Sequence, residues 1–279
     1  MQVRSHTLKS ARLKERRRKV FIGRIVIAVF CVSVLWGLVF WLSNLPSVTI
    51  SDIVVSGNIS VQSPDVVGEA QKFLAGRYFF TVPKASIFFY PEGAILKDVN
   101  DSFPRIASAS IGWKNFHTIE IKVSERVPVA KWCEAPTLQS WGSPGCFYLD
   151  STAFVFASET ISTTTPASLV AFYGPLASST PIGQTYHSAD YLKNRLNFAN
   201  DLFLAGFSVI SFLERAGGVS EANLSGGQRL IFADDTDLST ALGNFESLVS
   251  NPAFKAAGTF AKLDYIDLRF GNKLFYRLK

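Results

Sequence analysis

The chain has 279 residues, of which 48% are hydrophobic, and a net charge of +6. This length leaves room for one large or two modest domains. The charge is uneven, because residues 1–24 carry nine basic and one acidic side chain (+8), whereas the rest carries 19 basic and 21 acidic side chains (−2). The basic character therefore belongs to a tail, and we expect no nucleic-acid-binding face on the folded part.

An uncharged run of 18 residues, 25–42, follows the basic tail. About 20 helical residues cross a bilayer core, so we predict a cytoplasmic tail over 1–19 and a transmembrane helix over 20–43. Basic residues stay on the cytoplasmic side, which makes the chain a single-pass type II membrane protein with everything after Ser43 outside the cytoplasm. A cleaved signal peptide is the alternative, but the apolar run is too long and LSNLPS lacks a small-x-small cleavage site.

The first part after the predicted span has the order strand, helix, helix, strand, strand. Residues 48–58 alternate apolar and polar side chains, as a strand does. Ser63 is expected to cap a helix, and a second helix is expected from Glu92 to just before Pro104. Two alternating strands follow, joined by a turn at NF.

The second part is a series of strands with two helices, so the whole chain is predicted to be α+β. Strands are expected at CFYLD, AFVFA, LVAFYG and FSVISFLER, and helices over Ser188–Leu204 and from Asp237 onward. A final pair of strands, LDYIDLRF and KLFYRL, is joined by Gly271-Asn272.

The pentapeptide LSGGQ, Leu224 to Gln228, matches the signature of ATP-binding cassette ATPases. Such an ATPase also needs a phosphate loop with a Gly-Lys dipeptide, and this sequence contains none. We therefore expect no nucleotide and interpret EANL-SGG-QRLIF as a hairpin, in which Ser225, Gly226 and Gly227 supply positive φ angles.

Three cysteines divide between the predicted span, which contains Cys31, and the outer part, which contains Cys133 and Cys146. If KWC and CFYLD are adjacent antiparallel strands, the outer pair can form a disulfide; two free buried thiols are the alternative. A zinc site is disfavoured because the outer histidines, His117 and His187, lack ligand spacing to these cysteines. We expect no metal and no cofactor.

Residues with catalytic potential are few. His117 and His187 lie beside neither a G-x-S-x-G elbow nor a reactive cysteine, and we interpret both as exposed loop histidines. Asp234, Asp235 and Asp237 suggest a glycosidase or calcium site, but they more simply cap the following helix, with Asp237 as the N-cap. We expect that the protein is not an enzyme, with a membrane-anchored extracytoplasmic enzyme as the alternative.

Several of these features together resemble the FtsQ/DivIB family of bacterial cell division proteins. They are the basic tail, the single span, the V-x-G-N strand end, ERVPVA at Glu125 to Ala130 and YIDLRF at Tyr265 to Phe270. The resemblance runs from about Arg16 to Lys279 and implies a POTRA domain over 48–125 and a mixed β domain with flanking helices over 126–279. The chain departs from the family in having almost no tail after the last strand and in its cysteine pair.

The resemblance implies a divisome scaffold at the division septum that links division proteins and coordinates septal cell-wall synthesis. The implied partners are FtsB/DivIC-type and FtsL-type single-pass proteins and the septal peptidoglycan synthesis machinery. A partner strand would add to the last strand, because an edge strand presents unpaired backbone groups. The implied binding residues are Arg269, Phe270, Lys273, Leu274, Phe275 and Tyr276. An ordinary internal strand pair and a POTRA-type transport-associated protein are the alternatives.

Overall fold

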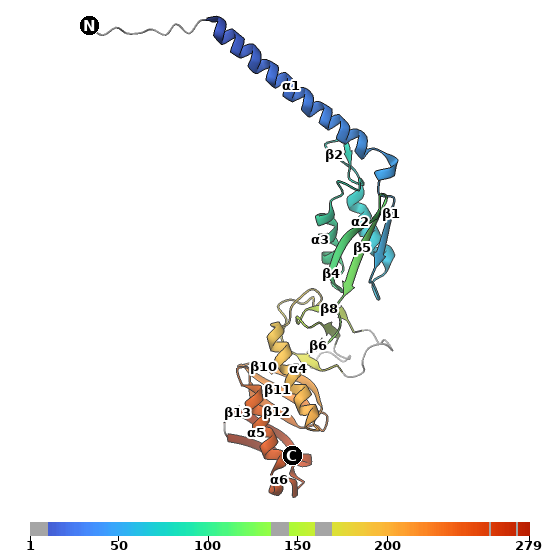
Figure 1. The fold of residues 1–279 in the computed structure, drawn as a ribbon. Helices are drawn as coiled ribbons and strands as arrows, with labels where there is room; N and C mark the ends of the chain where they lie inside the picture. The colour runs from blue at the N-terminus through green and yellow to red at the C-terminus, as the bar shows by residue number, and fades with distance from the viewer. Residues whose placement is uncertain (1–10, 135–144, 160–168, 257, 272) are drawn as a thin grey trace, which may run out of the picture. The chain divides into compact units, whose positions relative to one another are not determined.

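The computed structural model describes residues 11–134, 145–159, 169–256, 258–271 and 273–279 (Figure 1). The chain separates into two compact units, Met1–Ser124 and Glu125–Lys279. Both units contain helices and strands, in agreement with the predicted α+β class.

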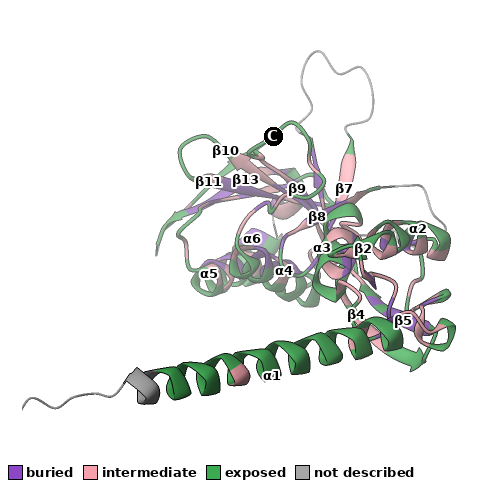
Figure 2. Cartoon of the chain, turned by 90° about the horizontal axis from the view of Figure 1, so that it is seen from above, coloured by how far each residue is buried: buried purple, intermediate pink, exposed green. Residues whose placement is uncertain are grey.

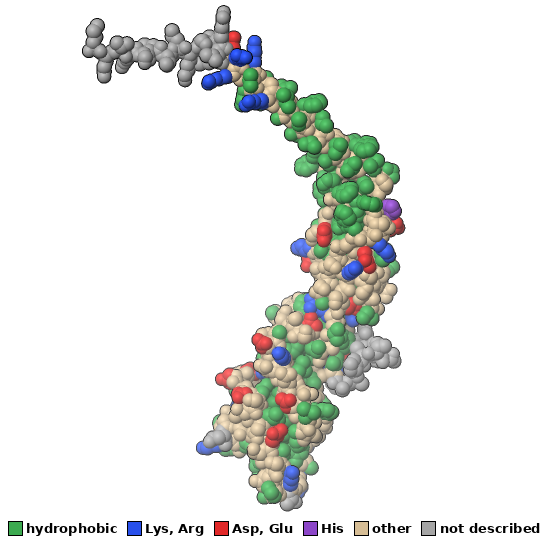
Figure 3. Space-filling model, viewed as in Figure 1, with side chains coloured by type: hydrophobic (Ala, Val, Ile, Leu, Met, Phe, Trp, Pro, Cys, Tyr) green, Lys and Arg blue, Asp and Glu red, His purple; other side chains and the backbone are tan. Residues whose placement is uncertain are grey.

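One long helix, α1 (Ala11–Ser43), begins the first unit. Its stretch Glu15–Ser43 is long and apolar enough to cross a membrane, with a mean hydropathy of 2.7 in its most apolar window. Figure 3 shows hydrophobic side chains along this helix, and most of them are exposed. The helix includes Arg16–Lys19, which we expected in the tail, because arginine and lysine are good helix formers. Residues 1–10 of the predicted tail lie outside the described part of the chain.

A three-stranded sheet and two helices form the rest of the first unit. β1 (Asp52–Ser56) is parallel to β5 (Thr118–Glu125), and β4 (Ile106–Asn115) completes the order β1-β5-β4. α2 (Ser63–Leu74) contacts β1, and α3 (Glu92–Ser102) contacts β4 and α2. The predicted order strand, helix, helix, strand, strand is confirmed. The core between these elements contains Val66, Ala70, Ile95, Val99, Ile106 and Ile121.

Three local features of the first unit differ from the expectation. A 3-10 helix, η1 (Pro46–Val48), links α1 to β1, and β2 (Arg77–Tyr78) forms a short antiparallel hairpin with β3 (Val82–Pro83) between α2 and α3. Ser63 does not cap α2 with its side chain; its Oγ accepts a hydrogen bond from Asn58 Nδ2 at 3.1 Å instead.

A nine-stranded mixed sheet organises the second unit, in the order β14-β13-β12-β11-β10-β9-β6-β7-β8. β9 is parallel to both of its neighbours and β12 is parallel to β13, while the other pairs are antiparallel. The strands are β6 (Ala130–Cys133), β7 (Cys146–Leu149), β8 (Val155–Ser158), β9 (Ala171–Tyr173), β10 (Val209–Arg215), β11 (Val219–Leu224), β12 (Arg229–Ala233), β13 (Leu263–Phe270) and β14 (Lys273–Leu278).

The helices of the second unit lie on one side of the sheet, as Figure 2 shows for α4 (Ala189–Leu204), α5 (Leu238–Ser250) and α6 (Pro252–Ala256). A short 3-10 helix, η2 (Thr259–Lys262), leads from α6 into β13. Ser188 caps α4 by accepting a hydrogen bond from the Tyr191 amide. Packing between helices and sheet buries an aromatic core that includes Phe172, Phe198, Phe212, Phe232 and Phe245. Because side chains alternate along a strand, residues between the core positions, such as Glu221 and Arg229, lie on the opposite side of the sheet.

The LSGGQ segment forms the turn between β11 and β12, which are antiparallel, so the hairpin interpretation is confirmed. The expected backbone of the turn was wrong in part. Gly227 has a φ of +80°, whereas Ser225 and Gly226 are not among the described residues with positive φ. A Cβ atom at Gly226 would lie 2.4 Å from Gln228 Oε1, so a close approach accounts for this glycine.

Candidate protein-binding site

The last strand, β14, lies at one edge of the nine-stranded sheet. It pairs with β13, with Phe275 opposite Asp267, Tyr276 opposite Ile266 and Arg277 opposite Tyr265. Among the described residues, no backbone hydrogen bond joins Lys273–Leu278 to any strand except β13. The backbone groups on its outer side are therefore free to accept another strand.

The two faces of β14 have different surroundings. Leu274 is half-buried against the core, and Tyr276 contacts Phe254 of α6 with the two rings perpendicular, 5.7 Å apart. Side chains alternate along a strand, so Lys273, Phe275 and Arg277 lie on the open face, away from the helices. All three are exposed.

A row of charges crosses five neighbouring strands on the open face. We call it the charged row, and it consists of Arg215 (β10), Glu221 (β11), Arg229 (β12), Asp264 (β13) and Arg277 (β14). Arg215 Nε lies 2.5 Å from Glu221 Oε1, Arg229 Nη2 lies 2.7 Å from Asp264 Oδ1, and Arg277 Nε lies 2.8 Å from Asp264 Oδ2. Hydrogen bonds from Arg229 and then Arg277 hold the pKa of Asp264 below its ordinary value. The row alternates in sign and ends on the edge strand with a cation.

The end of β13 adds a second cation and an aromatic ring beside the edge. Arg269 Nη2 donates to Asp267 Oδ2 at 2.6 Å, and the Arg269 guanidinium lies 5.6 Å from the centre of the Phe270 ring. Phe270 in turn contacts Phe275 with ring centres 5.1 Å apart. Burial favours the neutral form of Asp267, but its hydrogen bonds from Arg269 outweigh burial and lower its pKa.

The structure thus brings together all six residues that the resemblance implied for partner binding. They occupy β13 and β14, and five of them are exposed while Leu274 is half-buried. The members of the charged row on β10, β11 and β12 were not anticipated. Alternating charged residues in those strands were the available signal, but the order of the strands was needed to join them.

The two outer cysteines lie at the other end of the same sheet. Cys133 on β6 is directly opposite Cys146 on β7, and the two form a disulfide. The adjacent antiparallel strands that such a disulfide requires are therefore present.

The aspartates before α5 have separate roles. Asp237 caps α5 by accepting a hydrogen bond from the Ser239 amide at 3.0 Å, as predicted. Asp234 does not cap the helix, which corrects the expectation; its Oδ1 accepts from Arg195 Nη2 at 3.1 Å and from Ser220 Oγ at 2.5 Å. The reason is tertiary, because α4 places Arg195 beside the end of β12.

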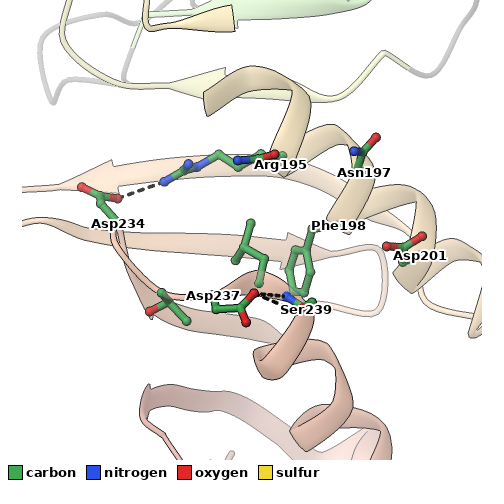
Figure 4. Close-up of a pocket in the computed structure, with 10 residues that line it drawn as sticks. Arg195, Asn197, Phe198, Asp201, Asp234, Asp237 and Ser239 are labelled. Atoms are coloured by element: carbon green, nitrogen blue, oxygen red, sulfur yellow. Dashed lines mark hydrogen bonds and ion pairs between the residues drawn. The ribbon is translucent and has the colours of Figure 1, made fainter. Parts of the chain in front are cut away.

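A polar cavity of about 370 Å³ lies between α4 and the start of α5, as Figure 4 shows. Asp234 and Asp237, which line it, are held by Arg195 and by the first turn of α5 respectively. The described residues that line it include no histidine or cysteine to serve as base or nucleophile. In the described part of the chain, no group of three or more His, Cys, Asp and Glu side chains is placed to hold a metal ion.

His187 belongs to a polar cluster, which corrects its interpretation as an exposed loop residue. Its Nε2 lies 2.8 Å from Glu214 Oε1, which also accepts hydrogen bonds from the hydroxyls of Tyr186 and Tyr191. Burial and the hydrogen bond to Glu214 raise the pKa of both tyrosines, so they stay protonated. The Arg195 guanidinium stacks 3.3 Å from the centre of the Tyr191 ring. The cluster ties α4 to β10. His117 is exposed in the turn between β4 and β5, as expected.

A scan against protein-family models matches none of them, and a search of curated proteins finds no significant match.

Proposed function

We propose that this chain is a membrane-anchored scaffold of bacterial cell division that binds its partner by β-strand addition to β14. The proposed partner is a small single-pass coiled-coil division protein of FtsB/DivIC type, in complex with an FtsL-type protein. Through them the scaffold would connect to the septal peptidoglycan synthesis machinery. The proposed orientation has the N-terminus in the cytoplasm and both units outside it, with the first unit acting as a POTRA domain.

The proposal rests on the exposed edge of β14. β14 is an edge strand with an unoccupied outer side, and its Phe275 lies beside Phe270 of β13; more than half the surface of each ring is exposed. Adding a strand satisfies the edge backbone groups in register, and adjacent side chains then select the partner. The sequence resemblance supplies the kind of partner.

The charges of β14 indicate which side chains the added strand should carry. The charged row contains three arginines and two carboxylates, and none of the ion pairs among the described residues includes Lys273. Directly opposite side chains of neighbouring strands come within about 5 Å at their Cβ atoms. The matching strand therefore carries carboxylates beside Lys273 and Arg277 and an apolar side chain beside Phe275.

A second copy of this chain does not provide that match. If two β14 strands pair antiparallel around Phe275, Lys273 of one copy lies opposite Arg277 of the other. Like charges that lie directly opposite destabilise a strand pair. In this register, like charges therefore oppose pairing of the open edge with another copy, while an acidic strand is still matched.

The test is capture of the FtsB/DivIC-type protein of the source organism by the full chain in nanodiscs. Phe275→Pro removes a backbone N–H from the edge strand, and we expect it to abolish capture. Phe275→Ser keeps the N–H, so partial capture is expected. Phe203→Ser is the matched control, because Phe203 is also an exposed phenylalanine but lies at the end of α4, and it should capture normally.

The double variant Lys273→Glu/Arg277→Glu tests whether the charges of β14 contribute to partner binding. Cross-strand ion pairs contribute about 0.2–1 kcal/mol each, so the two reversals should weaken partner binding by about fivefold or more at low salt. Amide exchange in β13 checks that the β13–β14 pair stays intact. Capture that is indifferent to Phe275→Pro would remove β14 as the binding site.

A further inference from the structure

The hairpin of β2 and β3 ends in two exposed phenylalanines. We call Phe79 and Phe80 the aromatic tip; 82% of the Phe79 surface and 97% of the Phe80 surface are exposed. Fully burying a phenylalanine side chain is favourable by about 1.5–3 kcal/mol. Two adjacent rings with almost no protein contact therefore indicate a surface that is covered by something outside the chain.

The backbone of the aromatic tip is also unusual. Phe79 has a φ of +46° and Phe80 a φ of +62°, in the left-handed region that bulky side chains disfavour. A residue held there costs about 1–3 kcal/mol, and Asn-Gly is the residue pair that such a turn favours. Local backbone preference thus does not account for Phe-Phe at this turn. The side chains themselves must account for it.

The aromatic tip is tied to the end of α1, the candidate membrane span. Arg77 Nη1, on β2, donates to Asn44 Oδ1 at 3.0 Å and to Thr81 O at 3.0 Å. Asn44 Nδ2 donates to Thr81 O at 3.4 Å. Asn44 directly follows the last residue of α1, and Figure 1 shows β2 beside the end of that helix. The tip is therefore held where a spanning α1 would leave the bilayer.

The side chains around the aromatic tip suit a membrane interface. Trp36 and Trp41, both exposed, lie in the last part of α1, as expected for aromatic residues at the level of the lipid headgroups. Two cations accompany the hairpin: Arg77 lies on β2, and Lys84 directly follows β3, with its Nζ 5.7 Å from the centre of the Tyr78 ring. Cations close to an anionic bilayer surface attract its headgroups.

We propose that the aromatic tip inserts into the interfacial region of the lipid bilayer, next to α1, and so provides a second membrane contact for the first unit. The partner of this surface is the lipid bilayer, and aromatic rings and basic side chains recognise it together. The inference is independent of any partner at β14. It rests on α1 crossing the membrane.

Spin-label accessibility tests the proposal on the full chain in nanodiscs of phosphatidylcholine and phosphatidylglycerol. One sample carries the label on native Cys31, a free and exposed cysteine within α1. Two further samples, in a Cys31→Ser background, carry it at Phe80→Cys or at Ile59→Cys. Ile59 is the matched control because 87% of its surface is exposed and it follows the far end of β1.

The readout is the ratio of collisions with oxygen, which concentrates in the bilayer, to collisions with a neutral nickel chelate, which stays in water. We expect the ratio at position 80 to approach that at Cys31 and to exceed that at position 59 severalfold. Equal ratios at 80 and 59 overturn the proposal. Protection of position 80 from both reagents also overturns it, in favour of a protein contact. A water-like ratio at Cys31 shows that α1 does not span, and the inference falls with it.

Discussion

The two edge strands of the nine-stranded sheet, β8 and β14, differ in whether another segment of the chain pairs with them. At the start of β8, the chain covers its own edge: the Val155 amide donates to Gln184 O at 2.7 Å, the Gly183 amide donates to Val155 O at 2.8 Å, and Phe154, just before β8, forms a bridge with Thr185. At β14, no such segment is found in the described part of the chain. Exposed edges invite unwanted pairing, so proteins normally cover or charge them.

The two edges of the sheet thus differ in whether the chain itself pairs with them. The start of β8 is covered by hydrogen bonds at Val155, and β8 lies next to β7, which carries one cysteine of the disulfide. The β14 edge carries the cations Lys273 and Arg277, which we propose repel another copy and attract an acidic strand. A covered edge stabilises the sheet, whereas the proposed function uses the charged open edge for selective binding. Three predictions test this contrast, beginning with the largest effect.

Removal of the disulfide should weaken the β8 side most. For Cys133→Ser/Cys146→Ser, we expect the free energy of unfolding to fall by about 3 kcal/mol, because a closed loop of this length restricts the unfolded chain. Urea unfolding of the full chain in detergent measures this, with tryptophan fluorescence as the readout. Trp132 reports locally, because it is buried beside Cys133. Partner capture at β14 should persist below the unfolding transition.

The control for this prediction is Cys31→Ser, which removes a thiol that is not part of the disulfide. It should leave the urea unfolding curve unchanged. An unfolding curve that a reducing agent does not shift would contradict the assigned role of the Cys133–Cys146 bond.

Weakening the hydrogen bonds between residues 183–184 and Val155 at the start of β8 should have a smaller, local effect. Gly183 has a φ of +92°, which a β-branched side chain adopts only with strain, so Gly183→Val should cost about 1–2 kcal/mol. The strain should loosen the segment from β8 and speed amide exchange at Val155, while exchange in β13 stays the same. Hydrogen exchange followed by mass spectrometry measures both.

Gly112→Val is the matched control, because Gly112 lies in β4, has no positive φ, and an added Cβ there meets no atom within 4 Å. It should leave exchange at β8 unchanged. If amide exchange at Val155 also stayed slow in Gly183→Val, the hydrogen bonds that cover the start of β8 would not depend on this turn.

Much of the fold could be predicted from local pattern. Alternating side chains located β1, β4, β5, β13 and β14, and capping residues located α4 and α5. The hairpin of β2 and β3 was missed because its turn carries Phe79-Phe80, which gives no turn signal. The order of the strands in the sheet could not be predicted either, because β9 pairs with β6 and β10, which lie far from it in the sequence.

The candidate site shows the same limit. The resemblance implied the residues of β13 and β14, but the charged row needs five strands in their spatial order. His187 and Asp234 were misread for a related reason: their partners, Glu214 and Arg195, lie 27 and 39 residues away in the sequence. Local sequence patterns locate helices, strands and capping residues, whereas ion pairs between these elements depend on the tertiary fold.

The smallest expected effect concerns the charged row and pH. The pKa of Asp264 is lowered in the folded protein, so this carboxylate contributes stability above its unfolded pKa of about 3.9, and that contribution is lost as the pH falls through the folded value. Asp264→Asn should therefore unfold at lower urea than the unaltered chain at pH 7, and the difference should shrink to nothing once the pH is well below 3.9. Asp235→Asn is the control, because Asp235 lies outside the row. A difference between Asp264→Asn and the unaltered chain that persists unchanged into strong acid would show that packing of the side chain, and not its charge, holds β13 and β14 together.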